Sequence, residues 1–254
     1  TATTRPCNYT QIFSKSVIVS GTAQEMDTAG RRNELLYQVE KRTKEIKRDI
    51  EYAITQNVAS NDGSAATARK LGGLETWIET NDNRGSGGSD GGYTTSTSQT
   101  VAPTDTSAGA TRTFTEARLK AVIKSIWDNA GGSAPLVVVG SWNKQKASAF
   151  TGIASPSQQS PMGPTASKSL AIIGAADIYV SDFGKHRIVP SRFSRSRTAL
   201  VLDPAYLDLC YLRPFKVTQL AKTGDADKRQ MIAELTMRVK NEKVLGVVAD
   251  LTTA

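Results

Sequence analysis

The chain is poor in the residues that build catalytic and metal sites. Its 254 residues include one histidine, His186, and two cysteines, Cys7 and Cys210. A transition-metal site or a nucleophilic triad needs such residues in a cluster, and these three are widely separated in the sequence. Two distant cysteines fit reduced thiols better than a disulfide framework, although a single bridge is not excluded. A lone histidine on a predicted strand favours a structural or surface position.

Long hydrophobic runs and ligand-binding motifs are also missing. No stretch of about 18 apolar residues occurs, so no membrane span is predicted, and no charged-then-apolar leader indicates secretion. The glycine-rich run 85–92 lacks the Gly-Lys-Ser/Thr ending of a phosphate-binding loop. The segment Thr223–Asp227 lacks the spaced acid of a calcium loop, so turn chemistry explains it better. We therefore expect no cofactor, no metal and no enzymatic activity.

Positive charge is what the chain has in excess. Its formal net charge is +8, spread along the sequence without an arginine-rich tail or a basic-aromatic motif. This charge fits two interpretations, solubility alone or a diffuse, sequence-independent field that faces a polyanion such as nucleic acid.

Residues 9–20 predict an extended strand, because β-branched and aromatic residues are dense there. Both faces of this strand carry apolar groups. Because no hairpin partner follows within twenty residues, we expect the strand to pair with an upstream segment or with another chain. The candidate subunit-interface residues lie on one face of it: Phe13, Lys15, Val17 and Val19.

Residues 24–56 carry the strongest helical pattern in the sequence. Opposite charges recur four residues apart, and at 1.5 Å per residue the helix would be roughly 45–50 Å long. The absence of a long partner helix disfavours a coiled coil. One narrow stripe, expected to face the long hairpin, recurs at spacings of three and four: Leu36, Val39, Thr43, Ile46, Ile50 and Ala53.

A low-complexity segment, 84–113, follows, in which Gly, Ser and Thr supply 19 of the 30 residues. A segment of this length is either a flexible linker or a loop laid across its neighbours, and we expect the second.

The second half of the chain predicts an α/β unit followed by long antiparallel strands. The α/β unit has a helix over 114–129 with Thr115 in capping position and Gly131-Gly132 at its end, a buried strand over 136–139, and a helix capped by Ser141. Further strands are predicted at 175–180, 186–189, 199–202 and 244–249. A long hairpin over 215–222 and 229–240 turns at Thr223, Gly224 and Asp225.

Six runs carry a family resemblance, in the family's order and over almost the whole chain apart from 84–113 and 155–168. They resemble the major capsid proteins of tailed bacteriophages, in the group typified by the Escherichia phage SU-ten. The resemblance implies an α+β fold of the Hong Kong 97 type. The runs are NYTQIFSKSVIVSGTAQ, AGRRNELLYQVEKRTKEIKRDIE, ARKLGGLETWIETN, SDFGKHRIVPSRF, LVLDPAYLDLCYLRPF and KTGDADKRQMIAELTMRVKNEKVLGVVADL.

The resemblance also implies a domain assignment. Residues 1–23 would be the returning strand of an extended loop, with an N-terminal arm expected ahead of Thr1. Residues 24–113 would form the peripheral domain with the spine helix 24–56, and 114–212 the α/β axial domain. Residues 213–254 would add the long β-hairpin of the peripheral domain and a closing strand. No residue pattern identifies a lysine–asparagine crosslink, so covalent joining of subunits is not implied.

As a function, the resemblance implies a structural subunit of the virion, assembled in the host cytoplasm. Its partners would be further copies of itself, in hexamers and pentamers of an icosahedral shell, and portal, scaffold and decoration proteins. Non-specific contact with packaged double-stranded DNA is expected on the basic side of the long helix, at Arg31, Arg32, Lys41, Arg42, Lys44, Lys47 and Arg48. The alternatives are a basic nucleic-acid-organising oligomer and a bacterial nanocompartment shell of the same fold.

Overall fold

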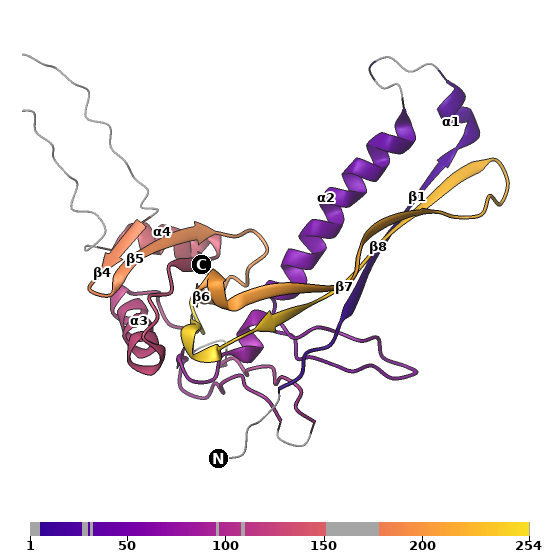
Figure 1. Ribbon diagram of the computed structural model, residues 1–254. Helices are drawn as coiled ribbons and strands as arrows, with labels where there is room; N and C mark the ends of the chain where they lie inside the picture. The colour runs from indigo at the N-terminus through magenta and orange to yellow at the C-terminus, as the bar shows by residue number, and fades with distance from the viewer. Residues whose placement is uncertain are drawn as a thin grey trace, which may run out of the picture. The chain divides into compact units, whose positions relative to one another are not determined.

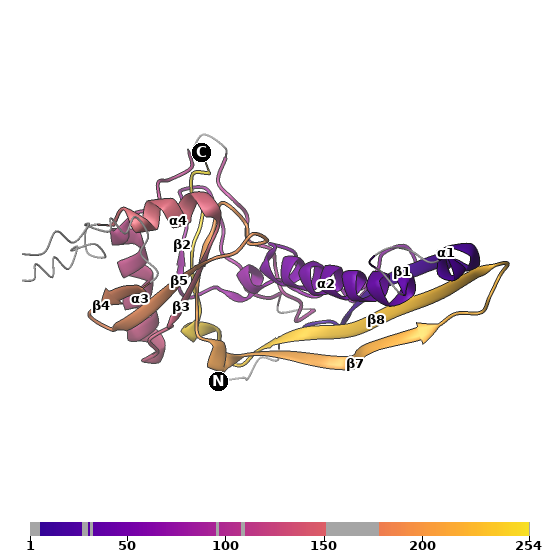
Figure 2. The ribbon, with the colours of Figure 1, turned by 90° about the horizontal axis from the view of Figure 1, so that it is seen from above.

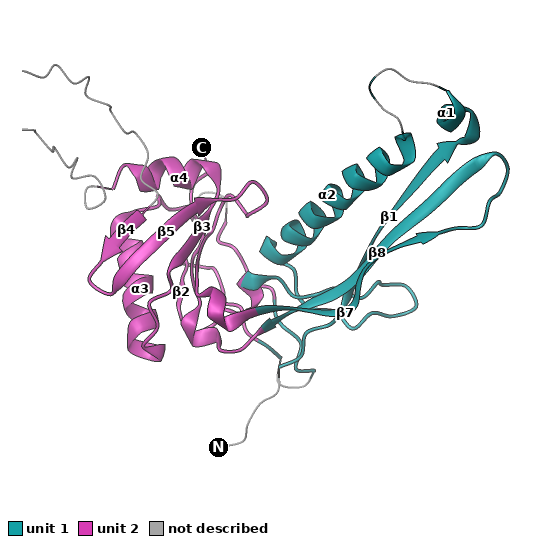
Figure 3. Ribbon diagram, turned by 45° about the horizontal axis from the view of Figure 1, so that its top comes forward, with its two compact units in different colours: residues 1–74, 93–101, 208–238 teal, residues 75–92, 102–207, 239–254 magenta. Residues whose placement is uncertain are grey.

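The computed structural model describes residues 6–26, 30, 33–94, 97–107, 110–150 and 178–253. The chain forms two compact units, each built from segments that are distant in sequence (Figure 3). Unit 1 comprises residues 1–74, 93–101 and 208–238, and unit 2 comprises residues 75–92, 102–207 and 239–254. Within the ranges described, no helix has the length and apolar character needed to cross a membrane.

Unit 1 is built on a three-stranded antiparallel sheet. Its strands are β1 (Gln11–Ser20), β7 (Leu207–Gln219) and β8 (Ala226–Val239), in the order β1-β8-β7. The predicted hairpin is confirmed as β7 and β8, and Gly224 at its turn has a φ of +82°, which glycine adopts without steric cost. β1 pairs with β8 over its whole length, from Gln11 opposite Leu235 to Ser20 opposite Ala226.

The predicted continuous helix over 24–56 is wrong in its first part. A short helix α1 (Gly21–Glu25) is followed by α2 (Glu34–Thr55), which at 1.5 Å per residue is roughly 33 Å long. Two local features separate them. Gly30 adopts a φ of +91°, outside the helical region, and the Asn33 side chain accepts a hydrogen bond from the Leu36 amide, which caps the start of α2.

The stripe of α2 packs on β1 and β8, so the expectation that it faces the long hairpin is confirmed (Figures 1 and 2). Ile46 and Ile50 lie in one cluster with Phe13 of β1 and with Met231 and Leu235 of β8. The first position of the predicted stripe is wrong. Leu36 is 60% exposed, whereas its neighbour Leu35 is 6% exposed and packs on the sheet.

Unit 2 contains a six-stranded mixed sheet in the order β2-β9-β6-β3-β5-β4, with helices α3 (Glu116–Ala130) and α4 (Ser141–Ser148). The pairs β2–β9 and β3–β5 are parallel and the others are antiparallel. Short 3-10 helices cover Leu74–Trp77, at the boundary between the units, and Pro204–Tyr206 and Glu242–Val244. The strands are β2 (Asp82–Asn83), β3 (Leu136–Val139), β4 (Ile178–Ser181), β5 (Gly184–Pro190), β6 (Ala199–Leu202) and β9 (Gly246–Val248).

Helix α3 packs closely on the sheet at Gly246, where an added Cβ would lie 2.4 Å from Cγ1 of Val122. Its buried face carries Leu119, Val122, Ile123 and Ile126, whereas Trp127 is 45% exposed, with its ring centroid 5.4 Å from that of Phe183. Gly131 ends α3 in the left-handed conformation, as predicted. Ser141 is the first residue of α4 rather than its cap, because Gly140 occupies the capping position.

Two boundaries of the predicted domains differ from the observed units. The closing strand β9 pairs with β6 in the sheet of unit 2, whereas 213–254 were expected to stay together with the hairpin. The low-complexity segment is divided between the units, with residues 93–101 in unit 1 and the flanking parts in unit 2. In unit 1, Ser60 and Thr100 exchange hydrogen bonds between amide and hydroxyl. The described part of the segment is thus held by its neighbours, as expected.

Candidate functional site

The predicted interface face of β1 is occupied by the core of its own unit. Phe13, Val17 and Val19 are 8%, 4% and 7% exposed and pack against α2, and Lys15 Nζ lies 2.8 Å from Oδ2 of Asp49 on that helix. The expectation that these side chains face a neighbouring chain is therefore wrong. The partner strand β8 lies more than 200 residues further along the same chain, and no local sequence signal indicated it.

One group of exposed apolar side chains in unit 1 lies along β7, an edge strand of the sheet, and at the residue that directly follows it. Others lie elsewhere in the unit, such as Ile12 and Ile18 of β1. We call the first group the apolar band. Its side chains are between 38% and 64% exposed, and alternation along the strand places Leu209, Tyr211, Phe215 and Val217 on one face and Leu212 on the other. The sequence carried a signal for this band, since apolar residues occupy both alternating positions of the strand. Its members are Leu209, Tyr211, Leu212, Phe215, Val217 and Leu220.

A groove separates this strand from α2 within unit 1. It encloses about 370 Å³. Leu209, Tyr211 and Phe215 form one wall, and Ile50 and Ile54 of α2 form the other. Lys47 and Glu51 also line it, so the groove is apolar inside with one charge of each sign on the helix side.

The predicted DNA-facing residues on α2 fall into three groups. Lys41, Lys47 and Arg48 are exposed along the helix. Lys44 is exposed as well and lies 2.7 Å from Glu40, and Arg42 lies 2.5 Å from Glu45. These hydrogen bonds lower the pKa of both glutamates. Arg31 and Arg32 lie outside the described residues.

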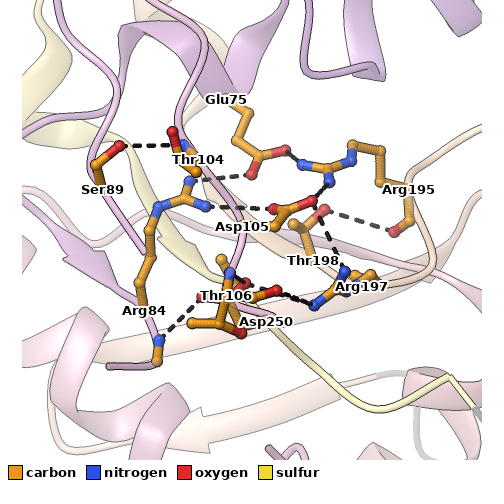
Figure 4. A network of polar contacts seen from close by, with 12 residues as sticks. Glu75, Arg84, Ser89, Thr104, Asp105, Thr106, Arg195, Arg197, Thr198 and Asp250 are labelled. Atoms are coloured by element: carbon orange, nitrogen blue, oxygen red, sulfur yellow. Dashed lines mark hydrogen bonds and ion pairs between the residues drawn. The ribbon is translucent and has the colours of Figure 1, made fainter. Parts of the chain in front are cut away.

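Unit 2 holds a buried charge network that the sequence did not reveal (Figure 4). Glu75, which is fully buried, lies 3.0 Å from Nη2 of Arg84 and 2.6 Å from Nη1 of Arg195. Arg195 also pairs with Asp105, and Arg84 Nε donates to Oδ2 of Asp82 at 2.5 Å. Burial raises the pKa of Asp82 to about 7, although the nearby Arg84 guanidinium acts in the opposite direction.

Asp250 binds two distant points of the low-complexity segment in the same region. Its carboxylate accepts hydrogen bonds from the Gly85 amide at 3.0 Å and from the Thr106 amide at 2.9 Å. Burial alone would raise the pKa of Asp250, but these two amides and the charge of Arg84 lower it. The network joins the low-complexity segment to the sheet of unit 2, and its carboxylates are engaged in holding the fold.

His186 has a structural position, as the sequence favoured. Its side chain is fully buried, 2.7 Å from Oγ of Ser181 and 2.9 Å from the carbonyl of Ala134, and burial lowers its pKa. Among the described residues, no group of three or more metal-binding side chains comes together.

Comparison with known proteins identifies the chain's family. A family model described as the SU10 major capsid protein matches residues 1–252. The chain belongs to the SU10 major capsid protein family. The major capsid protein of Escherichia phage Phieco32 is 27% identical to this capsid protein over 272 residues, which cover 95% of this chain and 74% of that protein.

Solved structures show that this capsid protein has the α+β Hong Kong 97-type fold of phage capsids and encapsulins. The holo-SrpI encapsulin complex of Synechococcus elongatus PCC 7942 has a TM-score of 0.57 at 10% identity, covering 96% of this chain and 75% of that one. The satellite phage P4 procapsid with its size determination protein has a TM-score of 0.53 at 10% identity, covering 99% of this chain and 75% of that one. The structure from Mycobacterium phage Patience has a TM-score of 0.53 at 11% identity, covering 98% of this chain and 72% of that one.

Proposed function

We propose that this capsid protein is a non-enzymatic subunit that assembles with copies of itself into a closed icosahedral head of hexamers and pentamers. The head would enclose double-stranded DNA, be built in the host cytoplasm, and add portal, scaffold and decoration proteins. The observation that carries this proposal is the family match, which spans residues 1–252. The geometry supports a structural role, because the buried carboxylates of unit 2 hold the fold and His186 is enclosed.

A bacterial nanocompartment shell is the second candidate, because an encapsulin shares the fold at a TM-score of 0.57. At 10% identity that likeness concerns the fold alone, whereas the family match is to phage capsid proteins. The two candidates differ in cargo. A head protects DNA from added nuclease, and a nanocompartment encloses protein.

Electron microscopy of the purified assembly, followed by nuclease treatment and extraction of the contents, tests this proposal. We expect closed shells that retain double-stranded DNA. Shells that hold only protein would favour the nanocompartment. Monomers or dimers alone under assembly conditions would overturn both candidates.

Contact with DNA is proposed for the exposed basic side of α2. Lys41, Lys47 and Arg48 lie along this helix without a base-reading motif, which suits weak, sequence-independent contact with phosphates. Replacing all three by Gln should reduce the salt dependence of duplex binding by about three units of slope, roughly one for each phosphate that the variant no longer neutralises.

The matched control for this experiment lies in unit 2. Lys120 and Lys124 of α3 are exposed lysines that pair with Glu116 and Asp128. Their replacement by Gln should leave the slope unchanged. An unchanged slope in the α2 variant would place the DNA contact elsewhere in the chain.

A further inference from the structure

The apolar band leaves large apolar side chains of β7 exposed when the subunit is alone. In unit 1, α2 packs on β1 and β8, and the groove lies between α2 and the third strand. Leu209, Tyr211 and Phe215 line the groove, while Leu212, which alternates with Tyr211, points to the other side of the sheet and is 64% exposed. β7 is also an edge strand, so both of its faces and one row of backbone groups are available to a partner.

The size of the band indicates what covers it. Six large apolar side chains with exposed fractions near one half leave roughly 500 Å² of apolar surface, at about 150–200 Å² for a fully exposed side chain. A standard protein interface buries about 800 Å² on each partner, of which roughly 60% is apolar. The band therefore matches the apolar share of one protein interface. A small molecule in the groove would leave Leu212 on the opposite face uncovered.

We propose that β7, with its apolar band and the groove it forms with α2, is covered by a second copy of this chain in the assembled shell. This inference rests on the proposed function, because a shell built from one chain makes another copy the protein present at every such surface. It also replaces the inter-subunit role first expected for the inner face of β1, whose side chains lie in the core of unit 1.

Hydrogen exchange tests this inference on the unmodified protein. Shells are assembled from the purified chain alone, and the amides of residues 209–217 are compared in shells and in unassembled subunits. We expect exchange in this segment to slow at least tenfold on assembly. Exchange as fast in shells as in free subunits would overturn the inference while leaving the shell-forming function intact.

A double variant tests the side chains. Tyr211→Ser with Phe215→Ser should lower the yield of shells at least tenfold, while the free subunit still unfolds cooperatively, because neither side chain belongs to the buried core. The control is Leu36→Ser with Tyr52→Ser, a pair 60% and 55% exposed on α2 and outside the groove. Normal shell yield from the β7 variant would contradict the inference. A wild-type chain that builds no shells would overturn the proposed function and the inference together.

Discussion

Two strands that are consecutive in sequence, β6 and β7, have opposite surroundings. β6 is apolar throughout, whereas β7 mixes large apolar residues with charged and polar ones. All four residues of β6 are buried, at 4% exposure or less, between β3 and β9 in the six-stranded sheet. β7 begins five residues later and is exposed along most of its length, at the edge of the three-stranded sheet. An interior position and a uniformly apolar sequence bury β6 within the subunit, whereas an edge position leaves the apolar side chains of β7 exposed. β7 is therefore the strand that we propose a second copy covers.

The largest expected effect comes from placing the same charge on each strand. Val201 on β6 is fully buried and Val217 on β7 is 45% exposed. Val201→Asp would bury a carboxylate without a partner and should lower the free energy of unfolding by about 4 kcal/mol or more. Val217→Asp should change it by less than about 0.5 kcal/mol. Denaturant unfolding of the unassembled subunit measures both, and similar losses would contradict the contrast between the strands.

The charge network gives a second test of the contrast between buried and exposed groups, because the buried charges of unit 2 pair with one another. Glu75→Gln removes the carboxylate that Arg84 and Arg195 share and should destabilise the subunit by about 3 kcal/mol, since two buried guanidiniums lose their common partner. The exposed pair of Glu40 and Lys44 on α2 supplies the control. Glu40→Gln should leave the denaturant midpoint unchanged. A Glu75→Gln subunit with the wild-type midpoint would show that the network does not stabilise the fold.

Asp82 adds a pH dependence whose sign follows from its raised pKa. Because the folded protein holds the Asp82 proton up to about pH 7, while the ordinary pKa is 3.8, the group favours folding most below pH 3.8. This contribution is lost as the pH rises towards 7, at no more than about 1.4 kcal/mol per pH unit. Asp82→Asn should abolish this contribution, so the stability difference between variant and wild type should change with pH between about 4 and 7. Parallel stability curves from pH 4 to 8 would place the pKa of Asp82 near its ordinary value.

Local signals predicted much of the fold. A short apolar run predicted β6 with its observed bounds, and the pair Gly131-Gly132 predicted the end of α3. Gly30 and Asn33 were local signals for the start of α2. The charge pattern continues across both residues, and for this reason the prediction extended the helix back to residue 24. Each of these features is decided by residues a few positions apart.

Features that depend on distant residues could not be predicted in the same way. β1 pairs with a strand more than 200 residues away, so its apolar face was assigned to a neighbour rather than to its own core. Arg195 and Glu75 are 120 residues apart, and nothing near either residue indicates the other. The candidate assembly surface was misplaced for this reason, since which face of a sheet is bare depends on what every other segment covers.

The smallest expected effect tests whether an exposed apolar side chain on α2 takes part in contacts between subunits. Leu35 and Leu36 are adjacent on α2, 6% and 60% exposed. Leu35→Ala should cost about 2 kcal/mol of unfolding free energy, whereas Leu36→Ala should cost less than about 0.5 kcal/mol. Leu36 does not belong to the apolar band, so its replacement should also leave the shell yield unchanged. A loss of shells with Leu36→Ala would mean that contacts between subunits extend onto α2, and that β7 is one part of a wider assembly surface.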